Sequence, residues 1–465
     1  MRPHPAVLLA LGLVLGPAMV PPPAGLSPLG WQVAGLAAAM ALLWITEAIP
    51  LPVTALLPAL VLPLAGLDSV DAVVASYASP ILLLVLGGAM VARAIERTGL
   101  HRRLALGVVR WAPRTERGLV AAFAASAASV SMLVSNTATA LILLPVALGV
   151  LRALEQGPPA SQPSPGLGPA LVLAVAWGAT VGGLGTLVGS PTNAVAAGIA
   201  SRALGTPIDF LTWLRFGLPL VALAVPLVVL VITRHFRVPE GRPAVGLGPG
   251  LAAQAPLSPA ERRLIPVMAL LLVGWVVLPL AGPPLGLADV PDFLVAAAAG
   301  LLLFVTGDGA GGRLLDARDV PHLPWDILAL FGGGLALAQA ISSSGLADWA
   351  GQRLGAVGDL PPLLLTLLVV GLVVLATEFA SNVATASGLV PVVAVMALEG
   401  PAASLALSMA AGLAASWGFM MPAGTPPNAL ALATGRVGAR QLARAGFVVD
   451  MAGIPLIAAV AFLGA

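Results

Sequence analysis

Long apolar stretches follow one another along the chain, and this pattern constrains the fold more than any other feature. They include Trp31–Glu47, Leu119–Leu151, Leu171–Ala200, Phe216–Thr233 and Phe447–Leu463. Only 9% of the residues are charged, whereas a soluble globular protein carries about 25%. Such a chain cannot cover a surface that faces water, so the solvent around it must be lipid. We expect an all-α polytopic membrane protein.

The lengths of these stretches predict more than simple spans. A single transmembrane helix needs about 20 residues, and several stretches exceed that length while others fall short. We therefore expect re-entrant or broken segments among ordinary spans. The chain has no cysteine, which excludes disulfides and thiolate metal sites. No basic face persists along the chain, so we predict no nucleic-acid partner.

Two parts of the chain carry the same sequence pattern. Ser131–Ala140 falls on Thr377–Ala386 at an offset of 246 residues. A second pair, Leu187–Ala194 and Pro422–Ala429, matches at an offset of 235, because the first half carries a longer polar link. Matching motifs in the same order at nearly constant offsets predict an internal duplication.

The distribution of charge predicts how the two halves lie in the membrane. Arg93–Arg117 holds seven Arg and two Glu, whereas the matching stretch Gln339–Asp359 holds one Arg and two Asp. Positively charged loops stay on the cytoplasmic side, so the two equivalent stretches should face opposite sides. That arrangement is an inverted-topology repeat, which is typical of secondary transporters.

The repeat predicts a division of the chain into two halves. Residues 1–233 form the first half, 234–263 a surface loop between the repeats, and 264–465 the second half. We expect re-entrant hairpins at about 118–152 and 363–398, and broken helices at about 169–200 and 403–432.

Four short polar segments interrupt the apolar stretches, and they are Ser131–Thr139, Thr186–Asn193, Thr377–Thr385 and Gly424–Asn428. Non-helical backbone survives in the bilayer core only where it is buried or lines a cavity. The first and third segments predict hairpin tips. The second and fourth contain proline, which removes a backbone donor and breaks a helix. Paired interruptions in two halves are typical of the binding site of a transporter.

The residue types in these segments indicate which ligands they bind. Ser, Thr, Asn and freed carbonyls are neutral oxygen ligands, which suit a hard cation such as sodium. The N-termini of broken helices expose amides that suit an anion. No Arg or Lys lies in the segments, so helix dipoles and bound cations would balance the charge of the anion. Packing of small residues between helices is the alternative, but a motif duplicated at a fixed offset argues against it.

Glu378 lies beside the second hairpin tip and falls on Met132 of the first half. An intramembrane carboxylate is a functional candidate, and Glu378 could carry a proton. Because it has no counterpart in the first half, a structural role is equally open. An intramembrane enzyme is disfavoured, since no nucleophile–base pair or metal cluster lies in the polar segments. A channel is a further alternative, but paired, proline-broken half-sites favour alternating access.

These motifs resemble a known family, the divalent anion/sodium symporters, which carry dicarboxylates, citrate or sulfate. The resemblance rests on Trp44–Pro58, which is close to a family signature, and on the paired Ser-Asn and paired Gly-Ser/Thr-Pro-x-Asn motifs. It implies a homodimer in the bilayer of a bacterial plasma membrane, with a scaffold domain and a transport domain that moves as an elevator. Sodium would be the coupling ion, and no organic cofactor is expected.

The resemblance also implies the residues of the site. In the first half, one sodium site would use Ser131, Ser135, Asn136 and the backbone around Gly189. In the second half, the equivalent site would use Thr377, Ser381, Asn382 and the backbone around Gly424. Residues in contact with the anion would be Asn136, Thr137, Ser190, Asn382, Val383, Thr425 and Pro426.

Val383 departs from the family pattern, which usually has threonine at this position. Loss of one donor from a carboxylate clamp would cost about 0.5–1.5 kcal/mol. We expect sodium-coupled symport of a small anion, with a di- or tricarboxylate as the first expectation. The alternatives are a sodium-independent dicarboxylate exchanger, a carrier of sulfate or another anion because of Val383, and a proton-coupled carrier that uses Glu378.

Overall fold

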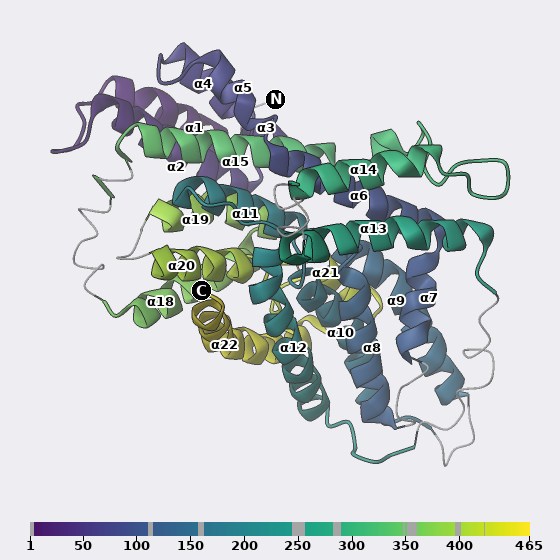
Figure 1. The fold of residues 1–465 in the computed structure, drawn as a ribbon. Coiled ribbons are helices and arrows are strands. Elements are labelled where there is room, and N and C mark those ends of the chain that lie inside the picture. Colours follow the sequence, from purple (N-terminus) through teal and green to yellow (C-terminus); the bar gives the residue numbers. More distant parts are fainter. Residues whose placement is uncertain are drawn as a thin grey trace.

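The computed structural model describes residues 4–109, 115–156, 162–243, 256–281, 290–346, 349–350, 360–395, 401–422 and 424–465. Every regular element in these residues is helical (Figure 1), so the predicted all-α fold class is confirmed. Seven of the described helices are long and apolar enough to cross a membrane. The inverted orientation of the two halves stays a prediction.

The first group of helices precedes the first polar segment. It comprises α1 (Pro5–Leu15), α2 (Pro28–Thr46), α3 (Leu51–Thr54), α4 (Leu57–Leu64), α5 (Val70–Ser76), α6 (Pro80–Thr98) and α7 (Leu100–Val109). Local sequence fixes several of their ends. The hydroxyl of Ser27 accepts a hydrogen bond from Gly30 N at 2.9 Å and caps α2. Gly99, with a φ of 78°, ends α6 in the left-handed conformation that glycine tolerates.

The polar segments of the first half lie at helix ends. The helices around them are α8 (Glu116–Ser131), α9 (Asn136–Glu155), α10 (Leu167–Gly183), α11 (Pro191–Leu204) and α12 (Phe210–His235). Helix α8 turns into α9 at the first Ser-Asn tip, and the chain between α10 and α11 leaves the helical path before Pro191. The hydroxyl of Ser135 caps α9, and proline is well suited to the first turn of α11.

The second half repeats this order, and three α-helices lie between the two sets in the residues that the structure describes. Those three are α13 (Pro259–Ala281), α14 (Asp292–Val305) and α15 (Trp325–Ser343). The repeated helices are α18 (Pro362–Phe379), α19 (Asn382–Val395), α20 (Pro401–Ala414), α21 (Pro426–Ala433) and α22 (Ala439–Gly464). Residues 244–255 of the predicted loop, 347–348 and 351–359 of the acidic stretch and 396–398 of the second hairpin lie outside the described residues.

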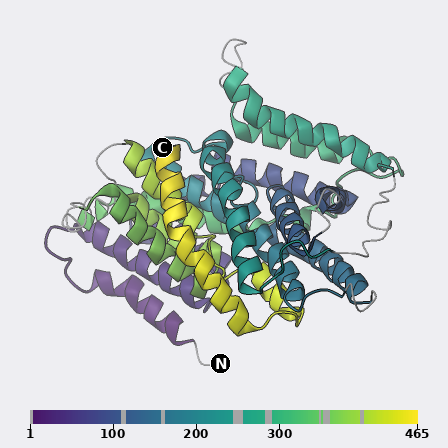
Figure 2. The same cartoon turned by 90° about the horizontal axis from the view of Figure 1, so that it is seen from below.

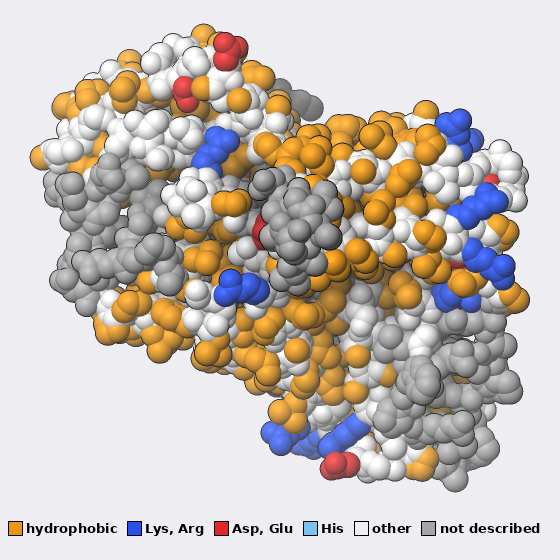
Figure 3. Space-filling model, in the orientation of Figure 1, with side chains coloured by type: hydrophobic (Ala, Val, Ile, Leu, Met, Phe, Trp, Pro, Cys, Tyr) orange, Lys and Arg blue, Asp and Glu red, His pale blue; other side chains and the backbone are white. Residues whose placement is uncertain are grey.

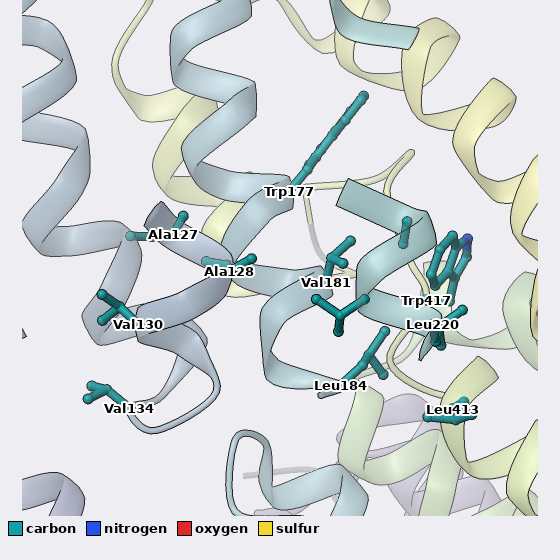
Figure 4. Packing of buried hydrophobic residues seen from close by; sticks show 14 of the residues in the cluster. Ala127, Ala128, Val130, Val134, Trp177, Val181, Leu184, Leu220, Leu413 and Trp417 are labelled. Atoms are coloured by element: carbon teal, nitrogen blue, oxygen red, sulfur yellow. The ribbon is translucent and has the colours of Figure 1, made fainter. Parts of the chain in front are cut away.

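Two of the three apolar clusters in the described residues fill most of the interior, and the third is a small contact between α1 and α2. The smaller of the two main clusters joins α2 to α15 and includes Met40, Trp44 and Leu337. The larger one joins both broken helices to α8, α12 and α22 (Figure 4). Within it, Trp177 of α10 meets Phe419, which lies in the break between α20 and α21, with ring centroids 5.6 Å apart. The two breaks are therefore parts of one packed interior.

The outer surface is largely apolar. Figure 3 shows hydrophobic side chains across the middle of one face, with most of the visible arginines towards its right-hand and lower edges and others in its left half. Large exposed apolar side chains lie on both the first and the last helices, and Leu8 and Leu463 are examples. An exposed apolar surface bordered by charge fits a lipid environment.

Small residues allow α8 and α10 to pack closely. An ideal Cβ on Gly178 would lie 2.5 Å from Ala124 O, and one on Gly182 would lie 2.2 Å from Ala128 O. Small residues four apart let membrane helices approach each other in this way. Helix α12 then packs against both α8 and α10, and against α22 on another side (Figure 2).

This contact predicts the effect of one substitution. Gly178→Val should destabilise the protein by about 1–3 kcal/mol, because the side chain must displace the backbone of α8. Thermal unfolding in detergent measures the loss. Gly149→Val on α9 is the matched control, since an ideal Cβ there meets no atom within 4 Å. Equal losses in the two variants would contradict the close packing of α8 and α10.

Candidate functional site

The asparagine of each Pro-x-Asn motif bridges its own helix break. Asn193 Nδ2 donates to Gly183 O at 2.7 Å and to Thr186 O at 2.8 Å. In the second half, Asn428 Nδ2 donates to Gly418 O at 3.3 Å and to Met421 O at 3.1 Å. The asparagine and its two acceptor residues in the second half each lie 235 residues after their counterparts in the first half. These bonds satisfy carbonyls that the broken helices leave without intrahelical partners.

The first hairpin tip packs against the first break. Ser131 Oγ donates to Asn136 Oδ1 at 2.7 Å, and Thr186 Oγ1 donates to Met132 O at 2.5 Å. The hydroxyl of Ser135 accepts from Ala138 N at 3.3 Å and caps α9. The structure therefore brings Ser131 and Asn136 together, while Ser135 starts the following helix.

Oxygen atoms converge around Gly189, which lies in the first break. An ideal Cβ on Gly189 would lie 2.7 Å from Gly183 O, 3.0 Å from Ser131 O and 3.1 Å from Thr186 Oγ1. A side chain at this position would fill the space between these oxygens. Hard cations take oxygen ligands, so the arrangement around Gly189 fits a bound sodium ion.

The second hairpin tip forms an equivalent cluster. Thr377 Oγ1 donates to Ala415 O at 2.6 Å and lies 2.9 Å from an amide atom of Asn382. That amide atom also lies 2.9 Å from Gly424 O and 3.3 Å from Ala415 O. If this atom is Nδ2 of Asn382, it donates to both carbonyls. If it is Oδ1, it lies with the hydroxyl and the two carbonyls in a group of oxygens that suits a cation. Ser381, like Ser135, caps the following helix through Ala384 N.

The helices after the two breaks begin with hydroxyl residues that leave their own helix ends uncapped. Ser190 precedes α11 and Thr425 precedes α21, and neither side chain caps its helix. Both are buried, and Thr425 Oγ1 has no hydrogen-bond partner. Pro426, at the start of α21, is exposed. Uncapped helix N-termini with a nearby hydroxyl can bind an anion.

A cavity of about 200 Å³ opens beside the first tip. Ser135, Gly189 and Ser190 line it, whereas Asn136 and Thr137 are not among its described lining residues. A water molecule takes about 30 Å³ in the liquid, so the cavity has room for one small organic anion. The cavity therefore joins Ser135 and Gly189, which belong to the predicted first sodium site, to Ser190, a predicted contact of the anion.

Charged side chains also border this cavity, and the sequence analysis did not assign them to the site. Arg93 and Glu96 of α6 line it together with His322. Arg93 Nε lies 3.3 Å from Asp319 Oδ1, and Arg93 NH1 lies 3.5 Å from Glu96 Oε2. No motif surrounds Arg93, so only the packing of α6 against the first break, where Gly88 meets Val188, reveals its place.

Asp319 belongs to a cluster of charges in the segment before α15. It also pairs with Arg97, which contacts Asp316 at 3.1 Å. Hydrogen bonds from the side chain and backbone of Arg318, with a further one from Arg97, hold the pKa of Asp316 well below its usual range. Asp316 therefore stays ionised at neutral pH, and its ion pair with Arg97 helps to hold the segment against α6.

Val383 lies between the two apolar clusters. Its half-buried side chain packs against both of them, and the smaller one includes Trp44 of α2 and Leu337 of α15. A threonine hydroxyl at this position would thus lie close to apolar side chains.

Glu378 holds the second tip to the second break. Its Oε1 accepts from Met420 N at 3.0 Å, and its Oε2 accepts from Met421 N at 2.7 Å. Glu378 is recognisable as a functional candidate from the sequence, but its two backbone donors are not, because they lie some forty residues further along the chain.

Comparisons with known proteins agree with this architecture. The chain is 33% identical to the sodium-dependent dicarboxylate transporter SdcS of Staphylococcus saprophyticus, over 97% of this chain and 90% of the relative. It is 32% identical to the protein of the same name from Staphylococcus aureus strain MSSA476, over 95% and 88%.

A solved structure and a family model complete the comparison. The YdaH transporter of Alcanivorax borkumensis has a similar fold, with a TM-score of 0.57 and 18% identity, over 83% of this chain and 86% of that chain. The model of the sodium:sulfate symporter transmembrane region matches residues 4–463. The chain therefore belongs to the sodium:sulfate symporter family of membrane transporters.

Proposed function

We propose that this chain carries a small dicarboxylate together with sodium. One observation supports the proposal above all others: a hairpin tip meets a helix break twice, and each break is bridged by an asparagine at the matching position. The two relatives named as sodium-dependent dicarboxylate transporters support the choice of both ligands. The chain is a multi-pass protein of the plasma membrane, in agreement with its apolar helices and bacterial relatives.

The oxygen clusters are our candidates for two sodium sites. The first would use Ser131, Asn136 and the backbone around Gly189, with Ser135 at its edge. The second would use Thr377, Asn382, and the carbonyls of Ala415 and Gly424, with Ser381 at its edge. In both, the hairpin supplies a hydroxyl and an amide, while the broken helix supplies carbonyl oxygens.

The anion would bind between the two breaks. Ser190 and Thr425, with the N-termini of α11 and α21, would supply hydrogen-bond donors for its carboxylates. Asn136, Thr137 and Asn382 are further candidate contacts from the two tips, and Val383 and Pro426 would border the site. No lysine or arginine lies in the tips or breaks, so bound sodium would balance much of the negative charge.

This electrostatic balance would couple the two ligands. Sodium in either cluster attracts a neighbouring carboxylate, and the carboxylate in turn strengthens sodium binding by the same factor. Removal of sodium would leave the anion with helix N-termini alone.

We also propose the homodimer and the elevator motion that the family resemblance implies, with no organic cofactor.

Two hydroxyl substitutions test the cation sites. Thr377→Val and Ser131→Ala should each raise the sodium concentration for half-maximal uptake about tenfold or more, since a ligand to a charge is lost. Uptake of labelled succinate into proteoliposomes measures the change.

Each substitution has a matched control on its own helix. Thr366 Oγ1 bonds to Pro362 O at 2.8 Å, and Ser129 Oγ bonds to Ala125 O at 2.8 Å, within α18 and α8 respectively. Thr366→Val and Ser129→Ala should leave the sodium dependence unchanged. Equal effects in site and control variants would argue against the assignment.

A panel of anions tests the substrate class. Succinate at about 100 times its dissociation constant should stabilise the purified protein by about 2.7 kcal/mol in sodium. The stabilisation should vanish when choline replaces sodium. Stabilisation that is equal in both salts would favour an exchanger, and a response to sulfate alone would exclude a dicarboxylate substrate.

Val383→Thr tests whether this position selects the anion. Because the side chain packs against apolar clusters, the new hydroxyl should cost about 1 kcal/mol of folding stability or more. The dissociation constant for succinate should stay within about twofold, since the one hydroxyl gained would lie among apolar side chains and not against the anion. Markedly tighter binding of succinate would mean that the new hydroxyl reaches the anion and that valine weakens the site.

A further inference from the structure

Arg202 is a partly buried arginine that the proposed transport site does not use. It lies in the last turn of α11, and its Nη1 donates to Ser76 Oγ at 3.0 Å. The other partly buried arginines among the described residues each pair with an acidic side chain, and they are Arg93, Arg103, Arg117 and Arg242. Arg202 forms no ion pair with any residue that the structure describes, so its charge lacks a fixed counter-charge.

A cavity of about 330 Å³ lies against Arg202, and we call it the Arg202 cavity. It lies among the start of α6, the end of α11 and the residues just before α12. The hydroxyl of Ser79, at the start of α6, lines the cavity and does not cap its helix. Ser201 lines it too, and its Oγ accepts from Ile208 N at 2.7 Å, which leaves the hydroxyl hydrogen for another acceptor. The cavity therefore offers a guanidinium and two hydroxyl groups to a ligand.

Asp209 is the one acidic residue among the described residues that line the Arg202 cavity. Its Oδ1 accepts from Thr212 N at 2.7 Å and caps α12. Oδ2 of Asp292, from α14, accepts from Phe210 N at 2.8 Å in the same helix end. A carboxylate at a helix N-terminus balances the positive end of the helix dipole. These two carboxylates therefore serve the start of α12, and the charge of Arg202 stays available to an anion.

Arg202 also borders a cavity of about 350 Å³ on another side. Asp68 and the C-terminal end of α15, with Ser343 and Ser344, line that cavity. A carboxylate and a helix C-terminus both disfavour a bound anion. The Arg202 cavity, which adjoins the N-termini of α6 and α12, is thus the better place for one.

The Arg202 cavity and the cavity beside the first tip lie along the same three helices. Both are lined by residues of α6, α11 and α15, which pack together. On α15, Ile327 lines the cavity beside the first tip and Leu335 lines the Arg202 cavity. On α11, Ala194 lines the former and Gly198 lines the latter. The two cavities are therefore one to two helical turns apart along the same contact between helices.

The side chain of Phe331 lies between the two cavities. Phe331 is one turn from Ile327 and one turn from Leu335, and residues four apart share a helix face. Its ring is buried, and an ideal Cβ on Gly198 would lie 2.0 Å from Phe331 Cζ. The cavities therefore open towards opposite ends of α6, with Arg93 at one end and Ser79 at the other. Because the arginine-rich end is predicted to be cytoplasmic, the Arg202 cavity is predicted to face outwards.

We propose that the Arg202 cavity is a second anion site, which binds a small carboxylate without sodium. The planar guanidinium can donate two parallel hydrogen bonds to one carboxylate, and the hydroxyls of Ser79 and Ser201 can donate to its other oxygens or to a second carboxylate. A dicarboxylate held there would lie in line with the transport site, on the other side of Phe331. The choice of a dicarboxylate rests on the proposed function, whereas the site itself rests on Arg202 and its cavity.

Binding in the Arg202 cavity should be weaker than binding at the transport site. One partly exposed charge holds the anion, and water weakens such ion pairs. Succinate concentrations that saturate the transport site should therefore leave the Arg202 cavity largely empty. The sodium-dependent stabilisation by succinate predicted above then belongs to the transport site.

The test is protection of Arg202 from phenylglyoxal, a reagent that modifies arginine side chains. The purified full-length protein is kept in a neutral detergent with choline in place of sodium, and mass spectrometry follows the modification of single residues. Succinate at about ten times its dissociation constant should slow the modification of Arg202 about tenfold. Arg215 is the internal control, because it is exposed at the start of α12 and does not line the cavity. Its modification rate should not change.

Two variants separate anion binding from a structural role, since a basic residue in the last turn of α11 also suits the helix dipole. Arg202→Gln should raise the half-saturating succinate concentration for uptake about three- to tenfold, because a fixed charge near the entrance concentrates the substrate. The half-saturating sodium concentration should stay unchanged. Arg202→Lys keeps the charge but loses the paired hydrogen bonds, so its effect should be smaller. Arg215→Gln, the matched control, should resemble the wild type.

The outcomes distinguish this inference from the proposed function. Equal modification of Arg202 with and without succinate would overturn the second site and leave sodium-coupled transport intact. Protection by added phosphatidylglycerol but not by succinate would also overturn it, because the cavity would then hold a lipid headgroup. Protection by succinate that requires sodium would assign Arg202 to the transport site and overturn a separate one. Protection in choline, in a protein whose uptake ignores sodium, would support the second site and overturn the proposed coupling.

Discussion

The asparagine bridge across each helix break is the interaction on which the rest of the site depends. A helix that breaks inside a membrane leaves carbonyl groups without partners, and no water is available to satisfy them. Asn193 and Asn428 each donate to two of these carbonyls. Their own Oδ1 atoms stay buried without a partner, so the bridge restores the helix ends but leaves a surplus of oxygen atoms in the interior. A surplus of buried oxygens is what a cation site requires, and here it follows from the need to stabilise a broken helix.

The sequence predicts the fold and the backbone of this site well, because both follow from local patterns. Apolar stretches predict the helices, and the repeated Ser-Asn and Pro-x-Asn motifs predict where tips and breaks lie. The sequence does not predict which groups each polar side chain contacts. Arg93 reaches the cavity only through the packing of α6, and Glu378 finds its two backbone donors in a break some forty residues away.

The two halves join their tips to their breaks at the same positions, and in both the break donates and the tip accepts, but the side chain comes from the break in the first half and from the tip in the second. In the first half, the side chain of Thr186 in the break donates to the backbone of Met132 in the tip. In the second half, the side chain of Glu378 in the tip accepts from the backbone of Met421 in the break. The backbone geometry can therefore be conserved while the charge changes. The carboxylate of Glu378 directly follows Thr377 of the second cluster, whereas Met132 takes that position in the first, so sodium ions at the two sites would be held with different strengths.

This difference bears on the order in which ligands bind. A dicarboxylate that enters before sodium would meet buried oxygens, and at the second tip it would also meet the carboxylate of Glu378, all of which repel it. Sodium at the second site would cancel that repulsion first, and sodium at the first site would then complete the positive surroundings of the anion. Arg93, which borders the cavity beside the first tip, is already paired with Asp319 and Glu96, so it does not replace the missing cation. With the site assigned as proposed, the protein would make anion binding depend on sodium by withholding fixed positive charge from the site, and its lack of lysine and arginine in the tips and breaks would be part of the coupling mechanism.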